Sequence, residues 1–214
     1  MTGPPDRTED DLIRLAAAGE EPALAELFGR HRKRLRRMVH LRLDRRLQGR
    51  VDPSDVLQDA YLDAAQQLPH YLNKPEMPLF LWLRLVTGQR LLRVHRQHLG
   101  AALRDAGREV SIYRGALPQA SSVSLAAQLL GRFTTASQAI IRAEVQLQLQ
   151  AALNGMEPLD SEIVAMRHFE ELSNAEAAVA LGLEPSAASK RYVRALKQLQ
   201  AILQDVPGLL DREG

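Results

Sequence analysis

The sequence predicts an all-α protein made of two small helical domains joined by a long linker. Apolar residues recur every three to four positions along almost every periodic segment, as in helices with one buried face. Clusters of the β-branched and aromatic residues that favour strands are scarce. Glycine, proline and serine gather between residues 101 and 135. We therefore expect domains at 8–100 and 137–205, with a linker at 101–136 that is partly helical around Leu125 to Leu130.

Composition restricts the class of protein. The 214 residues are 45% apolar, which is enough to form real cores, so global disorder is not expected. There is no cysteine, which excludes disulfides, thiolate metal sites and cysteine nucleophiles. The N-terminal residues lack the apolar core of a signal peptide, and no apolar run is long enough to span a bilayer. We expect a soluble, cytoplasmic protein with no membrane contact.

The near-neutral net charge of +2 conceals a strong segregation of charge. Ten Lys and Arg but one acid, Asp44, lie between Arg30 and Arg50, whereas Asp6 to Glu26 holds seven acids and two arginines. Such segregation favours a polyanion or an acidic protein surface as partner. A solvated helix face is the alternative explanation for the cations at positions 32, 33, 36 and 37.

Four helices are predicted in the first half. Asp52 and Pro53 give the third helix a clear start, with a capping carboxylate followed by proline at the first position. Pro69 is expected to end that helix, and His70 to Pro78 to form an irregular loop. The predicted helices are Asp11 to Ala18, a helix from Pro22 with Leu24, Leu27, Phe28, Leu35, Met38 and Leu41 buried, Pro53 to Leu68, and Leu79 to His98.

The second half predicts a helix-turn-helix. Ser173 and Glu176 have the spacing of a capping box, and Gly182 is suited to end the short helix that follows. Pro185 then begins a longer helix that carries Lys and Arg on its polar side and Ala188, Tyr192, Ala195, Leu196 and Leu199 on its apolar side. Any helical hairpin joined at a glycine could share this outline, but the cations on the second helix favour DNA binding. Two further helices are predicted before the helix-turn-helix. The first is capped by Thr135 or Ser137 and ends at Leu153, and the second runs from Pro158 to Phe169.

No arrangement of residues favours catalysis. The six histidines are scattered without metal-ligand spacing, and no Gly-rich phosphate loop is present. Asp52, Asp55, Asp59 and Asp63 lie at helical spacing, which a helix cap and a solvated acidic face explain more simply than a metal site does. A more specific hypothesis is that these carboxylates form a protein-docking surface. We expect no enzymatic activity, no cofactor and no metal.

The order of these motifs resembles that of bacterial RNA polymerase sigma factors of the extracytoplasmic-function (ECF) class of the sigma-70 family. The segment DVLQDAY from Asp55 is similar to the one that docks on the clamp of the polymerase's largest subunit. The segment FLWL from Phe80 is similar to the aromatic motif before the helix that melts and reads the −10 element. Glu176 to Leu183 and Ala188 to Ala195 resemble the helix-turn-helix that reads the −35 element. The resemblance covers roughly residues 12–99 and 148–203.

The resemblance implies partners and site residues. The partners are core RNA polymerase, through the clamp and the flap of the second largest subunit, duplex promoter DNA, the melted non-template strand and an anti-sigma factor. Polymerase binding is implied for Asp55, Val56, Gln58, Asp59 and Leu62. Contacts with the −10 region are implied for Tyr71, Trp82, Arg90, Arg93 and Arg96. Contacts with the −35 region are implied for Ser186, Ala187, Ser189, Lys190, Arg191 and Arg194.

The chain departs from the family's pattern at two places. Val86 to Gln89 stands where the family commonly has I-A-r-N, and Gly88 within it is expected to mark a bend in the helix. Ser186 and Ala187 replace the usual Gly-Thr at the start of the recognition helix. Aromatic residues are few, so we expect strand opening to depend on the polymerase and on one or two bases captured in the His70–Pro78 loop. A place in the core explains Trp82 better than a role as a stacking platform does.

Two other classes of function stay open at this stage. A helix-turn-helix regulator that senses a ligand or dimerises would bind duplex DNA tightly without polymerase. A helical nuclease or other phosphate-handling enzyme would need a metal held by Asp55 or Asp59.

Overall fold

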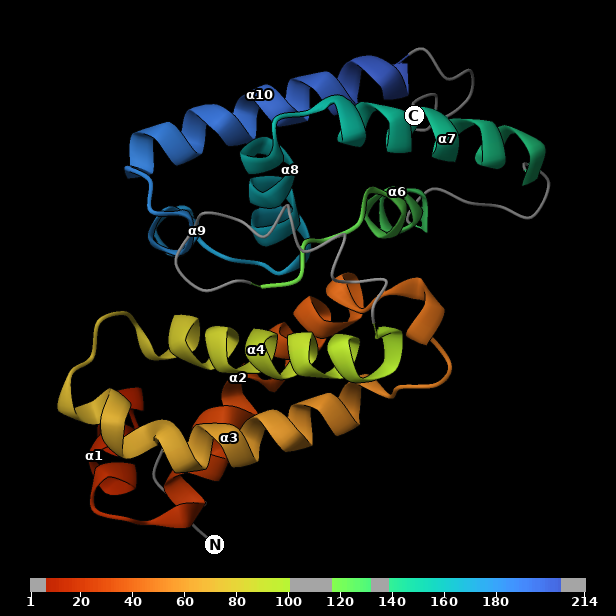
Figure 1. Ribbon diagram of the computed structural model, residues 1–214. Helices are drawn as coiled ribbons and strands as arrows, with labels where there is room; N and C mark the ends of the chain where they lie inside the picture. Colours follow the sequence, from red (N-terminus) through yellow and green to blue (C-terminus); the bar gives the residue numbers. More distant parts are fainter. Residues whose placement is uncertain (1–6, 101–116, 132–138, 205–214) are drawn as a thin grey trace, which may run out of the picture. The chain divides into compact units, whose positions relative to one another are not determined.

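The structure is a computed structural model that describes residues 7–100, 117–131 and 139–204 (Figure 1). Within these ranges every regular element except a β-bridge between Gln48 and Val51 is helical. The described residues divide into two compact units, the first comprising 7–40, 47–100 and 117, and the second 41–46, 118–131 and 139–204. The predicted all-α fold with two helical domains is confirmed.

The described part of the first unit is built from four α-helices. They are α1 (Glu9–Ala17), α2 (Glu21–Arg42), α3 (Pro53–Asn73) and α4 (Leu79–Leu99), and the short η1 (Arg45–Leu47) follows α2. Helices α3 and α4 lie side by side (Figure 1). The apolar positions predicted to face inward on α2 are all buried, and Leu27 and Leu35 are fully enclosed. The last residues of α2 are counted in the second unit.

Helix α3 begins as predicted but continues past Pro69. The Asp52 carboxylate accepts a hydrogen bond from the backbone N–H of Ser54 at 2.7 Å, with Pro53 at the first helical position. The predicted end at Pro69 is wrong, because the helix runs on to Asn73 and the loop is confined to residues 74–78. The added turn is held by Tyr71, whose ring stacks on Trp82 at 4.5 Å and whose hydroxyl donates to the carbonyl of Met77 at 2.9 Å.

Helix α4 passes through Gly88 without a break, so the expected bend is not seen. Gly88 is buried, and Leu117 fills the space that a side chain there would need. A Cβ built on Gly88 would lie 1.8 Å from Cδ2 of Leu117. The glycine therefore serves packing within the first unit rather than curvature.

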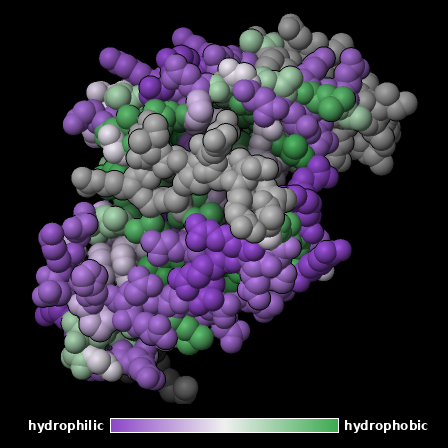
Figure 2. All heavy atoms as spheres, viewed as in Figure 1, coloured by the Kyte–Doolittle hydropathy of each residue, from purple (hydrophilic) through white to green (hydrophobic). Residues whose placement is uncertain are grey.

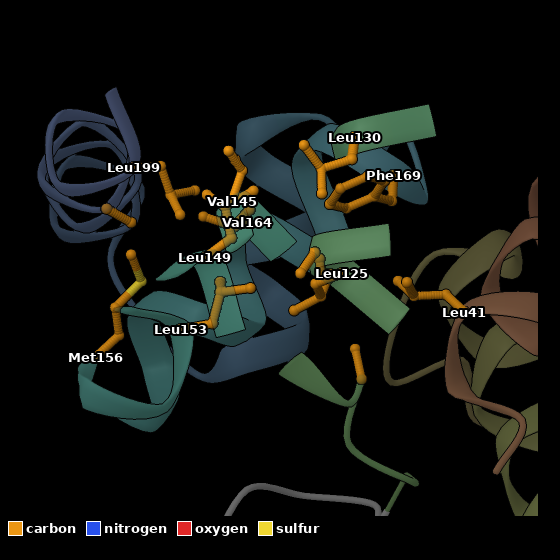
Figure 3. Close-up of a cluster of buried hydrophobic side chains, with 14 residues drawn as sticks. Leu41, Leu125, Leu130, Val145, Leu149, Leu153, Met156, Val164, Phe169 and Leu199 are labelled. Atoms are coloured by element: carbon orange, nitrogen blue, oxygen red, sulfur yellow. The ribbon is translucent and has the colours of Figure 1, made fainter. Parts of the chain in front are cut away.

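The second unit contains α6 (Ser122–Gly131), α7 (Ala139–Gly155), α8 (Pro158–Val164), a π-helical turn η4 (Ala165–Phe169), α9 (Asn174–Leu181) and α10 (Pro185–Gln204). Figure 3 shows side chains from α6, α7, α8, η4 and α10 converging on one core. Leu125 and Leu130 of α6 are fully buried in it, so α6 packs within this unit although the sequence predicted it as part of a linker. The predicted caps of α7, Thr135 and Ser137, lie outside the described residues.

The second unit also contains a buried group of charges. Arg42 is 3% exposed and donates hydrogen bonds to Glu170 at 2.6 Å, to Glu162 at 2.8 Å and to the carbonyl of Pro118 at 2.7 Å. Burial alone would lower the pKa of Arg42, but the charges of Glu162 and Glu170 outweigh it and raise the pKa. Arg42 is therefore a structural cation.

Candidate nucleic-acid and protein interfaces

The outer face of α3 presents a row of polar side chains with one exposed leucine. Gln58 and Asp59 lie three and four residues after Asp55, and Leu62 lies four and three residues after them, which places all four on a single arc of the helix. All four are exposed, and Leu62 is 52% exposed. We call these four residues the α3 row. Val56, predicted with them, is 1% exposed and belongs to the core.

The α3 row can bind a partner in two ways. Its carboxylates can accept hydrogen bonds from arginine or lysine, and Leu62 supplies apolar area that a partner could cover. Sequence reasoning found the row because helical periodicity separates inner from outer positions. It misplaced Val56 because a family motif groups neighbours in sequence and does not separate those two faces.

A network of charges joins α3 to α4. Asp63 is 7% exposed and accepts hydrogen bonds from Arg90 at 2.7 and 2.9 Å, while Arg93 lies 3.2 Å from it. Arg90 also lies 3.7 Å from Asp59 of the α3 row. The hydrogen bond to Asp63 raises the pKa of Arg90. Two cations predicted to contact the −10 region are thus engaged within the unit.

The two aromatic residues predicted for the −10 region face each other in the interior. Tyr71 and Trp82 stack with an angle of 18° between their rings, and each is 8% exposed. Burial, with a smaller contribution from the charge of Glu9, raises the pKa of Tyr71. In this arrangement neither ring offers a face to a base. Arg96, by contrast, is exposed and forms no ion pair with the described residues.

The helix-turn-helix has the predicted local geometry. Ser173 accepts from the N–H of Glu176 at 3.1 Å, and the Glu176 carboxylate accepts from the N–H of Ser173 at 2.7 Å. Gly182 adopts the left-handed conformation with φ of 64°, which glycine reaches without strain. The side-chain amide of Asn174 donates to the carbonyl of Pro185 at 2.8 Å, which connects the two helices.

The start of α10 offers side chains to a ligand. Ser186 and Lys190 are exposed, and Ala187 and Ser189 are partly buried. A shallow groove along this helix is lined by Ser189, Lys190, Val193, Arg194, Lys197 and Gln198. Val193, Lys197 and Gln198 were absent from the predicted site, although their spacing from Lys190 could have shown that they share its face. Leu196, predicted on the apolar side, is 36% exposed.

Arg191 and Arg194 hold α10 against the first turn of α8. Asp160, whose side chain is 2% exposed, accepts from Arg194 at 2.6 Å and from Arg191 at 2.8 Å, and Arg191 also bonds to Glu157 at 2.8 Å. Burial raises the pKa of Asp160, but the hydrogen bonds from the two arginines outweigh burial and leave it below its usual value. Both arginines were predicted to contact DNA, and the structure gives them partners within the unit.

The described ranges offer neither a metal-binding cluster nor a membrane-spanning helix. They contain no group of three or more His, Cys, Asp or Glu side chains that could hold a metal ion. None of the helices in those ranges is long and apolar enough to cross a membrane. On the face seen in Figure 2, hydrophilic residues predominate over the described surface.

The chain is similar to one known protein family in sequence and to solved structures in fold. Residues 146–199 match the family described as sigma-70, region 4, a segment that includes most of α7, all of α9 and most of α10. A structure of CnrH in complex with the cytosolic domain of CnrY is similar, with a TM-score of 0.51 and 21% identity over 90% of this chain and 95% of that one. The sigma factor RpoE in complex with the anti-sigma factor NepR from Bartonella quintana has a TM-score of 0.45 and 16% identity, over 85% and 96%. No curated protein gave a significant match.

The fold and site define a helix-turn-helix protein with a second helical unit. Residues 146–199 match the family model of sigma-70 region 4, in agreement with the resemblance found in the sequence. The likeness to the CnrH structure shows the same fold over most of the chain.

Proposed function

We propose that this protein is a sigma factor that binds core RNA polymerase and directs transcription initiation at promoters, without catalytic activity of its own. One observation carries the proposal. A single chain combines the exposed α3 row with a helix-turn-helix of the sigma-70 region 4 family. A DNA reader alone has no need of an exposed row of acids and leucine in a separate unit.

The proposed polymerase contact is the α3 row. Asp55, Gln58, Asp59 and Leu62 would meet the clamp of the largest subunit, while buried Val56 supports them from below. The flap of the second largest subunit is proposed as a further contact, on the basis of the family resemblance.

The proposed promoter contacts divide between the units. Residues at the start of α10 would contact base edges and phosphates of the −35 element, with Ser186, Ser189 and Lys190 foremost. Arg96, and Arg93 from its exposed position, would contact phosphates near the −10 element. Because Tyr71 and Trp82 are buried, we assign base capture on the melted non-template strand to the 74–78 loop that they support.

A regulatory partner and a cellular location accompany the proposal. The fold is shared with CnrH, whose structure was solved with the cytosolic domain of CnrY, and we propose that an anti-sigma factor binds this chain. Work with RNA polymerase would take place in the cytoplasm.

Run-off transcription with purified core polymerase tests the proposal. Addition of this protein should produce transcripts from start sites that core polymerase does not use alone, and the two should co-elute. Tight duplex binding without any polymerase association would instead identify a helix-turn-helix regulator. Metal-dependent turnover of nucleic acid that is lost with Asp55→Asn would identify an enzyme.

A further inference from the structure

Helix α2 carries an exposed cationic face that the proposed function does not use. Arg32, Lys33, Arg36 and His40 are all exposed and fall within an arc of about 100° at the helical advance of 100° per residue. We call these four residues the α2 stripe. They all belong to the first unit.

The other cations of this segment have contacts within the chain. The guanidinium of Arg34 lies over the ring of Phe80 at 3.5 Å from its centroid, and Arg30 pairs with Glu26 at 2.6 Å. The pKa of Asp52 is lowered mainly by the hydrogen bond from the N–H of Ser54. The charge of Arg36, a member of the stripe, makes a smaller contribution in the same direction. Arg32, Lys33 and His40 form no ion pair or hydrogen bond with the described residues. The stripe is therefore available to an external anion.

Apart from the attraction between Arg36 and Asp52, folding stability gives no reason for this arrangement. Arg32 and Arg36 are four residues apart and Lys33 and Arg36 are three apart, spacings at which like charges destabilise a helix. Gly29 lies on the same arc, and a Cβ there would meet nothing within 4 Å. A glycine inside a helix is also unfavourable. The residues on this arc therefore lower the stability of the helix, and they do not pack against the rest of the described chain.

We infer that the α2 stripe binds the phosphate backbone of DNA, as a contact separate from those proposed for α4 and α10. The stripe spans about 12 Å along the helix, a length that covers roughly three to four phosphates at 3.4 Å per nucleotide. Arginine is suited to phosphate because its guanidinium can donate two parallel hydrogen bonds. Only the location of this contact at a promoter rests on the proposed function.

The absence of an apolar anchor favours DNA over an acidic protein surface. Protein interfaces have an apolar centre with few charges, surrounded by a polar rim. Among the described residues, the exposed large apolar side chains lie on α3, α7, α9 and α10, and none lies on α2. The α3 row, which includes Leu62, has the composition of a protein interface, whereas the α2 stripe has that of a phosphate contact.

The test measures binding of the full-length chain to a fluorescent duplex of arbitrary sequence over a range of salt concentrations. The triple variant Arg32→Gln, Lys33→Gln, Arg36→Gln is compared with Arg7→Gln, Arg14→Gln, Arg50→Gln, which removes three exposed cations of the same unit outside α2. The stripe variant should bind at least about tenfold more weakly at low salt, and its salt slope should fall by about two to three. The control should stay within about twofold of the unsubstituted chain.

Three results would overturn the inference. Equal losses in both variants would show that only net charge matters. An unchanged affinity in the stripe variant would remove the contact. Loss of core polymerase binding with an unchanged DNA slope would assign the stripe to an acidic protein surface.

The outcome is separable from that of the proposed function. If the unsubstituted chain directs no run-off transcription but the stripe variant still loses DNA affinity, the proposed function fails and this inference stands. If the triple variant unfolds, Arg32→Gln alone carries the test, with an expected fall in slope of about one. Arg32→Lys should restore binding, because it retains the charge.

Discussion

Asp160 shows how one buried carboxylate can determine the role of a recognition helix. Its side chain is 2% exposed and receives hydrogen bonds from both Arg191 and Arg194, which belong to the helix proposed to read DNA. Those arginines orient α10 relative to α8. We therefore expect them to position the helix and Lys190 to contact phosphate.

Asp160→Asn should destabilise the second unit by about 1.5–3 kcal/mol, because the hydrogen bonds it loses are to charged groups. The pKa of Asp160 lies below its usual value in the folded state. Its stabilisation is therefore complete above about pH 4 and is lost as the pH falls through the lower folded-state pKa. Denaturant unfolding between pH 3 and 7 measures this, and Asp160→Asn should show a smaller acid-induced loss of stability. An equal loss in both proteins would contradict this role.

Two glycines form a matched pair for a second prediction at this scale. Gly29→Ala should raise the free energy of unfolding by about 0.5–1 kcal/mol, because the site is open and helical. The free energy of unfolding of Gly88→Ala should be lower than that of Gly29→Ala by about 1–2 kcal/mol, because Leu117 must move to make room for the added methyl group. Thermal unfolding of the two variants measures the difference. The same gain at both sites would show that Leu117 does not pack on Gly88.

At the scale of elements, the pair α3 and α4 combines a docking face with a network that positions a helix. Asp63→Asn should destabilise the first unit by about 1.5–3 kcal/mol, because Arg90 and Arg93 lose their shared carboxylate. Asp59→Asn should change stability by less than about 1 kcal/mol, since its contact with Arg90 is long and exposed. Under the proposed function, Asp59→Asn should weaken core polymerase binding. Denaturant unfolding and a core-binding titration separate these effects, and the reverse pattern would refute the assignment.

The helix-turn-helix yields a prediction on two neighbouring cations. Lys190→Gln should weaken binding to all DNA sequences and lower the salt slope by about one without changing the melting temperature. Arg191→Gln should lower the melting temperature, because Arg191 bonds to Asp160 and Glu157. If the Lys190→Gln and Arg191→Gln variants had equal melting temperatures and lost equal DNA affinity, Arg191 would be a direct DNA contact.

The sequence predicted local structure better than it predicted contacts between distant residues. The cap at Asp52, the capping box at Ser173 and the turn at Gly182 depend on residues within a few positions of each other, and all three were confirmed. The engagement of Arg191 depends on Asp160, which lies 31 residues away. Helical periodicity shows which face a side chain occupies but not what it meets there.

The same reason explains one error in an element boundary and the place of α6 in the second unit. Pro69 was expected to end α3, but the stack of Tyr71 on Trp82 holds the following turn. Helix α6 was assigned to a linker because its neighbours are rich in glycine, proline and serine, yet Leu125 and Leu130 complete a core with α7 and α10. Tertiary packing outweighed local preference in both cases.

At the scale of the whole molecule, two helical units supply different parts of one proposed task. The second unit contains the helix-turn-helix, within the segment that matches sigma-70 region 4, and the first contains the α3 row and the α2 stripe. Tethering several modest contacts raises the overall affinity without requiring any one of them to be strong. The α3 row is the part that would make such a DNA reader a polymerase subunit.

The most direct test of that claim is run-off transcription at limiting protein, with core polymerase and two variants of the same helix. Gln58 and Gln67 are both exposed on α3, and nine residues of separation place them on opposite faces. We expect new transcripts with the unsubstituted protein. Gln58→Arg should give at least about tenfold fewer, because a substitution at an interface centre typically reduces the binding free energy by about 1.4 kcal/mol or more. Gln67→Arg should cause little change. No transcript with the unsubstituted protein, or equal activity of the two variants, would contradict it.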